Sequence, residues 1–445
     1  MEFTVIILAA GKGTRMRSER AKPLHEIAGK ALISWVMDAA TQAGCTDILV
    51  VTSPEQDELQ HAISDNSTLY IQKQQNGTAD AVRATQSHLD RLPADRPVII
   101  LYADTPLITP DTIAMLISQI TAGTDLCVSG FETDAPTGYG RLKTDASGGL
   151  VAIIEESDAN QDEKTITHVN GGIMAGKAGL FQTILPTIGA DNAQQEYYLT
   201  DMVSLAYQAG HEISYQLVEA SELAGINDRA QLATAEHHMQ ERLRAQHLAA
   251  GVSMIAPHTV TFAYDTQIGA DTLIEPNVFF GRDVRIASRC HIKGFSHIEG
   301  AELAESVTVG PFARLRPGTR LDADVKVGNF VEIKKSHLEK GAKASHLSYL
   351  GDSQIRAEAN IGAGTITCNY DGQNKYKTII GAGAFIGSNS SLVAPVQIGD
   401  NALIGAGSVI TSNVDADALS LARAEQRTIK QGAKRVKSKT KTGQS

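Results

Sequence analysis

The chain has 445 residues, of which 42% are hydrophobic and 20% charged, as in a soluble globular protein with two or three domains. This composition excludes wholesale disorder, and the formal net charge of −10 argues against general nucleic-acid binding. The four cysteines (Cys45, Cys127, Cys290 and Cys368) form no close pair, so we expect neither a disulfide framework nor a zinc site, and a cytoplasmic location. The first apolar run is too short for a bilayer and lacks a basic leader, so we expect no signal peptide and no stable membrane insertion.

The first predicted strand is the apolar run Thr4–Ala10, and it ends in the loop Gly11-Lys12-Gly13-Thr14-Arg15-Met16. Two glycines let a backbone approach a triphosphate, and Arg15 and Lys22 supply positive charge for phosphoryl transfer. The glycines alone would also fit an ordinary strand-to-helix turn. The loop is not a Walker motif, because no Gly-Lys-Ser/Thr closes it. Together with Lys22-Pro23-Leu24, it resembles the signature of sugar-phosphate nucleotidyltransferases, which join a nucleoside triphosphate to a sugar 1-phosphate.

Further strand-length apolar runs follow helical patterns, at Asp47–Thr52, Thr68–Gln72, Pro97–Tyr102 and Asp125–Phe131. Such alternation predicts an α/β Rossmann-like domain over residues 1–227, with a mostly parallel sheet and helices on both faces. Ligands of these sheets bind beyond the carboxyl ends of the strands. The polar residues directly after each run are therefore the candidates for a site.

Two of these positions carry distinctive chemistry. Gln72, Gln75, Gly77 and Thr78 follow the third run, and their amides suit the edge of a pyrimidine, although a plain polar loop would look the same. Asp104 ends the fourth run, where a buried carboxylate needs a partner such as Mg²⁺. The alternative role for Asp104, capping the helix expected near Pro110, is better served by Thr109.

The later motifs, taken in order, are similar to one family throughout: the bifunctional bacterial enzymes that make UDP-N-acetylglucosamine with a uridylyltransferase and an acetyltransferase domain. The resemblance covers Phe3 to about Arg427. It implies that UTP binds to Leu8, Ala9, Gly11, Gly13, Arg15, Lys22, Gln72, Gln75, Gly77 and Thr78, with Arg15 and Lys22 catalytic. It further implies Mg²⁺ at Asp104 and Asn227, and a sugar-phosphate pocket made by Gly140, Glu155, Asn170, Tyr198, Thr200 and Asn227.

Three positions depart from the usual pattern of that family. Asp80 stands where His is common, Ala103 where Gly commonly precedes the metal-binding Asp, and Gly171 where Thr usually follows the pocket Asn. The first two lie beside the predicted nucleotide and metal positions, and the third beside the sugar. The residues that carry charge and metal are retained.

A long helix is predicted between the two halves of the chain, in residues 228–250. Arg229–Ala250 contains no proline or glycine and is rich in helix formers, and Gly251 would end it. His237, His238 and His247 lie on this helix. A metal site is one interpretation, but we expect these histidines on the surface of a solvated helix.

Residues 251–427 follow a period of six, which indicates a left-handed parallel β-helix. The aliphatic positions of this repeat are Ile268, Ile274, Phe280, Ile286, Ile292, Ile298, Leu303, Val309, Leu315, Leu321, Val327, Ile333, Ile380, Ile386, Leu392, Ile398, Ile404 and Ile410. Small residues such as Gly269, Gly310 and Gly328 are expected at its corners. Such prisms resemble hexapeptide-repeat acyltransferases, which implies a homotrimer formed through the β-helix.

The repeat is predicted to break at residues 334–377, where polar groups crowd in. His346 is the candidate general base, since imidazole suits proton transfer near neutral pH. The resemblance implies that Arg316, Lys334 and Lys375 bind the phosphate of glucosamine 1-phosphate, and that Tyr349, Asn360 and Asn369 bind its sugar. Tyr370 would complete the transfer site with Asn369, and acetyl-CoA would contact Ser388, Ala406 and Arg423.

We therefore expect a two-step enzyme that acetylates glucosamine 1-phosphate and joins the product to UTP, supplying a precursor for peptidoglycan and lipopolysaccharide. Two rivals remain open: a nucleotidyltransferase whose prism only oligomerises or regulates, and a non-catalytic assembly subunit built from the same modules. Residues 428–445 are predicted to be a flexible basic tail, with six basic and no acidic residues from Lys430 onward.

Overall fold

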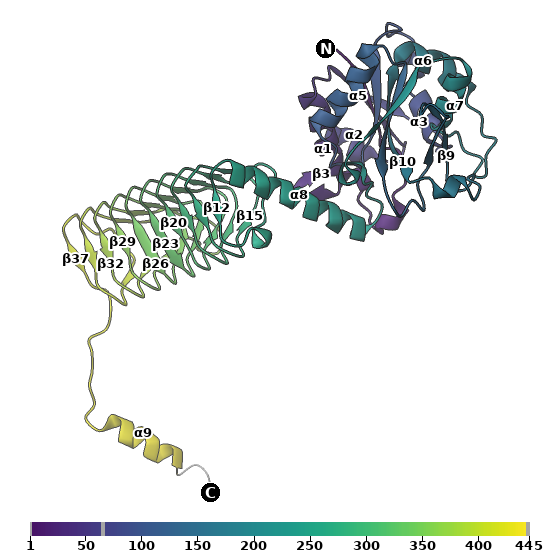
Figure 1. Cartoon of the computed structure of the whole chain (residues 1–445). Helices are drawn as coiled ribbons and strands as arrows, with labels where there is room; N and C mark the ends of the chain where they lie inside the picture. The colour runs from purple at the N-terminus through teal and green to yellow at the C-terminus, as the bar shows by residue number, and fades with distance from the viewer. Residues whose placement is uncertain (1, 64–66, 442–445) are drawn as a thin grey trace. The chain divides into compact units, whose positions relative to one another are not determined.

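The computed structural model describes residues 2–63 and 67–441 of the chain. The chain divides into two compact units, Met1–Leu243 and Arg244–Ser445. The first unit is a sheet covered by helices, and the second is a stack of short strands (Figure 1).

The sheet of the first unit has the strand order β11-β7-β10-β6-β1-β4-β5. Pairing is parallel except at β10, which runs antiparallel to β6 and β7, and in the added pair β8 and β9. The mostly parallel α/β sheet predicted from the sequence is confirmed. Its strands are β1 (Thr4–Leu8), β4 (Asp47–Thr52), β5 (Thr68–Ile71), β6 (Pro97–Tyr102), β7 (Leu126–Glu132), β8 (Arg141–Thr144), β9 (Leu150–Ile154), β10 (His168–Lys177) and β11 (Ile213–Leu217), beside a small hairpin of β2 (Glu26–Ile27) and β3 (Lys30–Ala31).

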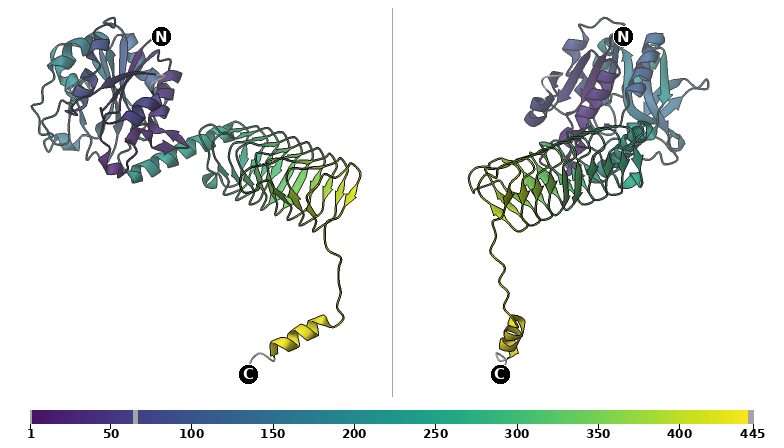
Figure 2. Two further views of the ribbon diagram at one scale, coloured as in Figure 1. Left: turned by 180° about the vertical axis from the view of Figure 1, so that it is seen from behind. Right: turned by 90° about the vertical axis from the view of Figure 1, so that its left-hand side faces the viewer.

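Helices cover both faces of this sheet, as the two views of Figure 2 show. Alternate residues of β1 belong to two separate cores: Val5 and Ile7 lie in one, and Ile6 and Leu8 in the other. This alternation follows from the two-residue period of a strand, and it explains why β1 is apolar throughout. The helices are α1 (Leu32–Gln42), α2 (Asp57–Ile63), α3 (Thr78–Arg83), α4 (Gln86–Leu89), α5 (Pro110–Ala122), α6 (Ala178–Ile184) and α7 (Asp201–Gln208).

Helix α5 begins as the sequence predicts. The Thr109 hydroxyl accepts a hydrogen bond from the Thr112 backbone N–H at 3.2 Å, and Pro110 occupies the first turn. Asp104 is therefore not needed as the cap of this helix.

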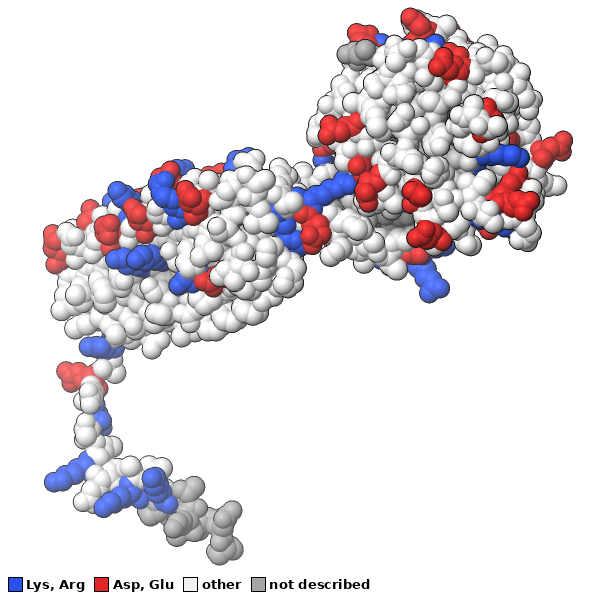
Figure 3. Space-filling model, viewed as in Figure 1, with Lys and Arg blue, Asp and Glu red and all other residues white. Residues whose placement is uncertain are grey.

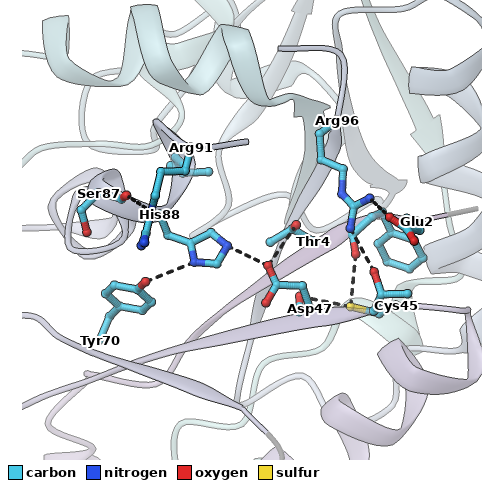
Figure 4. A network of polar contacts seen from close by, with 12 residues as sticks. Glu2, Thr4, Cys45, Asp47, Tyr70, Ser87, His88, Arg91 and Arg96 are labelled. Carbon is cyan, nitrogen blue, oxygen red and sulfur yellow. Dashed lines mark hydrogen bonds and ion pairs between the residues drawn. The ribbon is translucent and has the colours of Figure 1, made fainter. Parts of the chain in front are cut away.

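A polar network ties β1, β4 and β5 to helix α4 near the start of β4 (Figure 4). The Asp47 carboxylate lies 2.7 Å from Nε2 of His88 and accepts a 3.4 Å hydrogen bond from the Thr4 hydroxyl. Nδ1 of His88 lies 3.2 Å from the Tyr70 hydroxyl. Because Thr4 is buried and Asp47, Tyr70 and His88 are half-buried, each interaction is partly shielded from competing water.

The second unit is a parallel β-helix whose strands stack into three sheets. The first sheet contains β12 (Ser253–Met254), β14 (Leu273–Ile274), β17 (His291–Ile292), β20 (Thr308–Val309), β23 (Lys326–Asn329), β26 (Lys343–His346), β29 (Asn360–Ile361), β32 (Phe385–Ile386), β35 (Leu403–Ile404) and β37 (Leu419–Ser420). The second contains β13 (Gln267–Ile268), β16 (Arg285–Ile286), β19 (Ala301–Leu303), β22 (Thr319–Leu321), β25 (His337–Leu338), β28 (Ser353–Ile355), β31 (Thr378–Ile380) and β34 (Val396–Ile398). The third contains β15 (Phe279–Phe280), β18 (His297–Ile298), β21 (Arg314–Leu315), β24 (Glu332–Lys334), β27 (Tyr349–Gly351), β30 (Ile366–Cys368), β33 (Ser391–Val393) and β36 (Val409–Ile410).

The predicted aliphatic positions fill the core of this prism, and all but the half-buried Ile268 are buried. The left-handed β-helix inferred from the period of six is thus confirmed. The predicted break at residues 334–377 is wrong, because the strands continue through most of it with buried Leu338, Ala344, Leu350 and Ile355 inside. Steps of five residues and a small alanine hide the repeat in the sequence, and the irregular part is only the segment between β30 and β31.

Glycine forms some of the corners of the coils, as predicted for Gly310, which has φ +93° between β20 and β21. Left-handed backbone falls largely on other residues, among them Asn277, Asp283 and Phe295 with φ between 58° and 60°. The predicted corner glycine Gly328 lies in β23, where an added Cβ would come 1.8 Å from the carbonyl oxygen of Ser345. It is required there by the close stacking of coils.

Helix α8 (Arg229–Ala249) occupies the predicted linker, but not every histidine on it is a surface residue. His247 is only 7% exposed, packs against the Phe262 ring with centroids 4.5 Å apart, and has its pKa lowered by burial. The prediction of a surface residue is wrong for His247. Among the described residues, no group of three His, Cys, Asp or Glu side chains forms a metal site on this helix or elsewhere.

Within the predicted tail, Gly432–Lys441 form helix α9, which the sequence analysis did not predict. Ala, Lys and Arg in this segment are good helix formers. Lys430, Lys434 and Lys437 are exposed, and residues 442–445 lie outside the described part of the chain. Figure 3 shows basic side chains along this part of the chain. Across residues 2–63 and 67–441, none of the helices combines the length and apolar character that crossing a membrane requires.

Replacing His88 by Ala should lower the free energy of unfolding of the first unit by about 1–3 kcal/mol, because Asp47 and Tyr70 both lose a partner. Thermal and urea denaturation would measure this. Ser87→Ala, at an exposed neighbour on the same helix, is the matched control and should leave stability unchanged. Equal stability of the two variants would show that the network contributes nothing.

Candidate active sites

A cavity of about 480 Å³ lies at the carboxyl ends of β1 and β6, the edge where a parallel sheet binds ligands. Most of the residues predicted to bind a nucleotide line it. They are Leu8, Ala9, Gly11, Lys22, Gln72, Gln75, Gly77 and Thr78, joined by Asp104 from the predicted metal site.

Gly13 and Arg15 are not among the residues that line this cavity. Gly13 has φ +60°, and a Cβ there would lie 2.8 Å from Cβ of Lys22, so the glycine makes room for Lys22. Arg15 lies on a short 3₁₀ helix, Thr14–Met16, and is exposed. A direct contact of Arg15 with a bound nucleotide therefore stays a prediction.

The loop after β5 is held against the cavity by backbone contacts. Gly77 has φ +115°, and a Cβ at this position would lie 2.5 Å from the carbonyl oxygen of Tyr197, so no larger residue fits. Gln75 donates a 2.8 Å hydrogen bond from Nε2 to the Ala10 carbonyl, and the Thr78 hydroxyl accepts one of 3.0 Å from the Leu199 N–H. These contacts join three loops that are distant in sequence around one space.

Lys22 and Asp104, which line this cavity, meet Asn227, which does not. Nζ of Lys22 lies 2.5 Å from Oδ2 of Asp104 and 3.2 Å from Oδ1 of Asn227. The Lys22 and Asp104 side chains are only 12% and 19% exposed, which strengthens their attraction. Two side-chain oxygens that meet around a single cation are a donor set that fits Mg²⁺, so the residues present are compatible with the predicted metal.

A second cavity, of about 420 Å³, is lined by Tyr102, Asp104, Asn170 and Asn227, among other residues. Next to Asn170 lie further residues of the predicted sugar-phosphate pocket. The Asn170 N–H donates to the Gly140 carbonyl at 2.8 Å, and a Cβ on Gly140 would lie 3.5 Å from Oε2 of Glu155. The Thr200 hydroxyl in turn donates to Oε1 of Glu155 at 2.9 Å.

Burial shapes the acid–base properties of this second region. Burial raises the pKa of Glu155, and the neighbouring Asp158 and Asp201 add to the effect, while the hydrogen bond from Thr200 opposes it. Burial likewise raises the pKa of Tyr198. Gly140, Glu155, Asn170 and Thr200 are thus brought together by the fold, and the charge of Glu155 adds to the effect of burial on the Tyr198 pKa.

Sequence reasoning missed Tyr102 and Glu196. Tyr102 lines both cavities, and burial raises the pKa of its hydroxyl. Its position at the carboxyl end of β6, two residues before Asp104, was the available signal. Glu196 lines the first cavity from a loop that only the tertiary structure brings there.

In the second unit, His346 ends β26 and is exposed to solvent. Its Nδ1 lies 2.7 Å from Oδ1 of Asn329 on the neighbouring coil, because parallel pairing sets these two residues side by side. An amide oxygen accepts only from a protonated Nδ1, which leaves Nε2 free to take a proton. Asn329 is a partner that the sequence analysis did not identify.

Three cations interact near the third sheet of the prism: Arg316 directly after β21, Lys334 at the end of β24, and Lys375 in the segment between β30 and β31. The positive charges of Lys375 and Arg316 lower the pKa of Lys334, because like charges nearby disfavour its protonated form. Arg316 also donates to Glu332 at 2.8 Å. Such a cluster is suited to binding an anion with several charged oxygens, such as a phosphate.

The remaining predicted residues lie on adjoining coils. A Cβ on Gly351 would meet the Tyr349 hydroxyl at 2.5 Å and Nδ2 of Asn369 at 2.8 Å, so these two side chains are neighbours. Asn369 also donates to Asp352 at 2.5 Å, whereas Tyr370 is 59% exposed. Asn360 pairs with Lys343 in the sheet that contains His346.

The positions predicted to contact acetyl-CoA are also stacked. Arg423 donates to the Ala406 carbonyl at 2.7 Å, and the Ser388 carbonyl accepts a 2.8 Å bond from the Gly407 N–H. The three residues therefore lie on consecutive coils, and all are exposed.

The fold and these sites define a two-domain transferase. Residues 5–168 match the family model of the MobA-like NTP transferase domain, and residues 377–412 match that of the bacterial transferase hexapeptide repeat.

Relatives that match nearly the whole chain identify its family. The chain is 46% identical over 444 residues to "Bifunctional protein GlmU" of Zymomonas mobilis, covering 99% of this chain and 98% of the relative. Proteins with the same name from Azorhizobium caulinodans and Agrobacterium fabrum are each 48% identical, covering 96% and 95% of this chain and 95% and 93% of theirs. The chain belongs to the family of bifunctional GlmU proteins. The prediction of an enzyme with a nucleotidyltransferase and a hexapeptide acyltransferase domain is thereby confirmed.

Glu155→Gln should stabilise the first unit at about pH 8 and have no effect below pH 4.5, the ordinary pKa of a glutamate. A folded-state pKa raised by burial means that the carboxyl contributes stability only while protonated, and this contribution is lost as the pH rises. Glutamine removes the buried charge and still accepts from Thr200.

Urea denaturation at both pH values would measure the effect, with Glu156→Gln as the matched control. The hydrogen bond from Arg141 lowers the pKa of Glu156, so this variant should lose stability at the higher pH. The same sign of change in both variants would contradict the assignment.

Lys334→Ala should raise the KM for the phosphorylated acetyl acceptor by about tenfold or more, since one charge-assisted contact is lost. Thermal stability should be unchanged or slightly higher, because Lys334 is repelled by Lys375 and Arg316. Lys326→Ala, at an exposed lysine of a different sheet, is the control. An unchanged KM would remove Lys334 from the site.

Proposed function

We propose that the first unit transfers uridylyl from UTP to N-acetylglucosamine 1-phosphate, and that the second transfers acetyl from acetyl-CoA to glucosamine 1-phosphate. The observation that carries this proposal is that each unit has its own cluster of polar side chains: Lys22 with Asp104 and Asn227 in the first, and in the second both the pair His346–Asn329 and the cations Arg316, Lys334 and Lys375. The proposed domain limits are 1–227, 228–250, 251–427 and 428–445.

In uridylyl transfer, a phosphate oxygen of the sugar 1-phosphate attacks the α-phosphorus of UTP, and pyrophosphate leaves. No protein nucleophile is needed, so the chain contributes position and charge. Lys22, which lines the first cavity, would neutralise phosphate charge, with Arg15 as a second cation. Asp104 and Asn227 would hold Mg²⁺, which supplies further charge neutralisation on the triphosphate when bound.

The remaining predicted residues of the first unit bind the two substrates. Gln72, Gln75, Gly77 and Thr78 would contact the uracil and ribose from the wall of the first cavity. Asn170, with Gly140, Glu155, Tyr198 and Thr200, would hold the sugar in the second. Tyr102 and Asp104 line both cavities, which supports an arrangement with the reacting phosphates between them.

In acetyl transfer, the amine of glucosamine 1-phosphate attacks the thioester carbonyl, and the thiolate of CoA leaves. Nε2 of His346 would take the proton that the amine loses as the new bond forms. Asn329 supports this role because it accepts from Nδ1 and so selects the tautomer with a free Nε2. Arg316, Lys334 and Lys375 would bind the phosphate.

We infer that the enzyme acts as a homotrimer in the cytoplasm, where it would supply UDP-N-acetylglucosamine for cell-wall synthesis. Phe295, Phe312 and Phe330 form an exposed ladder of rings stacked 5.0 and 5.2 Å apart along one corner of the prism. Leu347, 60% exposed, continues this corner directly after His346. Exposed apolar surface of this kind favours contact with another copy of the chain, which would bring that copy next to His346.

The test is a pair of crossed variants assayed for both activities. Lys22→Ala should reduce pyrophosphate release from UTP and N-acetylglucosamine 1-phosphate at least about a hundredfold and leave acetyl transfer intact. His346→Ala should reduce release of CoA from acetyl-CoA and glucosamine 1-phosphate by a similar factor and leave uridylyl transfer intact. Each variant is the folding control for the other. Absence of either activity in the unaltered protein would overturn the corresponding half of the proposal.

A further inference from the structure

The amide of Gln72 is held by two groups that can only accept hydrogen bonds. Its Nε2 donates to Oδ2 of Asp80 at 2.8 Å and to the Gly77 carbonyl at 3.1 Å. Both amide protons of Gln72 are used in this way, so its orientation follows from chemistry, since turning the amide over would set an oxygen against two acceptors.

This arrangement determines what Gln72 offers to a ligand. The side chain is 5% exposed and lines the first cavity. Among the contacts of the described residues, no donor reaches its Oε1. Oε1 of Gln72 is therefore available to accept a hydrogen bond from a ligand in the cavity.

We propose that Asp80 is a positioning residue that selects the base of the nucleotide substrate, by fixing Gln72 as a hydrogen-bond acceptor. This inference rests on the proposed uridylyltransferase function of the cavity. Uracil carries a proton on N3, which Oε1 of Gln72 can accept, whereas N3 of cytosine is a bare acceptor that Oε1 repels. Asp80 itself does not line the cavity, so it acts only through Gln72.

The identity of residue 80 matters because an ionised carboxylate can accept hydrogen bonds but cannot donate them. A histidine at this position could present either a donor or an acceptor nitrogen, according to its tautomer. Asp80 on helix α3 can only accept. The carboxylate of Asp80 therefore permits one direction of the Gln72 amide.

The experiment compares kcat/KM for UTP and CTP in pyrophosphate release with N-acetylglucosamine 1-phosphate. The native chain should prefer UTP, and Asp80→Ala should reduce the UTP/CTP ratio by about tenfold, because one of the two restraints on the amide is lost. Asp80→Asn should give a ratio between those of the native chain and Asp80→Ala, since its Oδ1 can accept from Gln72 but its NH2 group can also turn toward the amide. A merely structural role for Asp80 would lower both kcat/KM values together and leave their ratio unchanged.

Asp90→Ala is the matched control, because Asp90 accepts a 2.7 Å hydrogen bond from Nε2 of Gln86 in an equivalent pair on the surface. It should not change the ratio. An unchanged ratio in Asp80→Ala would overturn the inference. If the native chain used neither nucleotide, the proposed function itself would fail.

A second measurement needs no variant and covers the case in which Asp80→Ala does not fold. UTP methylated on N3 lacks the proton that Gln72 would accept, whereas UTP methylated on C5 retains it. The native chain should use the N3-methyl compound at least about tenfold less well than the C5-methyl compound. Equal use of the two would overturn the assignment of Gln72 as an acceptor at N3.

Discussion

Parallel pairing of strands is the constraint on which both sites depend. In the first unit, β1 and β6 run parallel in register from Thr4 with Val98 to Leu8 with Tyr102, so their carboxyl ends open at one edge. In the second, β23 and β26 pair so that Asn329 lies opposite His346. Both the shared edge of β1 and β6 and the pair Asn329–His346 follow from parallel strand direction and from the hydrogen-bonded register.

The two candidate sites differ in their balance of charge. Around Lys22 a single cation is balanced by Asp104 and by the amide oxygen of Asn227, which suits a place where metal and phosphates exchange with protein groups. Around Lys334 the cations outnumber their partners, which lowers the pKa of Lys334 and prepares the surface for an anionic group. A balanced cluster suits a site where the charge on a substrate is redistributed during the reaction. An unbalanced cluster suits a site that only binds a charged group.

Much of the fold could be predicted from the sequence, for simple reasons. The buried strands of the first unit are continuous apolar runs, since both faces of the sheet are covered, and the bounds of β4 and β6 were predicted without error. The β-helix was readable because each coil repeats one buried position. The repeat was wrongly predicted to break at residues 334–377, because a core position there is occupied by Ala344, which is smaller than the aliphatic residues at the other core positions.

The candidate site residues divide in the same way. Local sequence by itself determined the Lys22-Pro23-Leu24 motif and the strand ends at Gln72, Asp104 and His346, since residue type and spacing are properties of the chain. Only the tertiary structure decided that Asn227 meets Lys22, that Asn329 faces His346 and that Asp80 holds Gln72. These contacts depend on how loops and coils pack, and on which atom of each side chain donates or accepts. Spacing along the sequence contains neither kind of information.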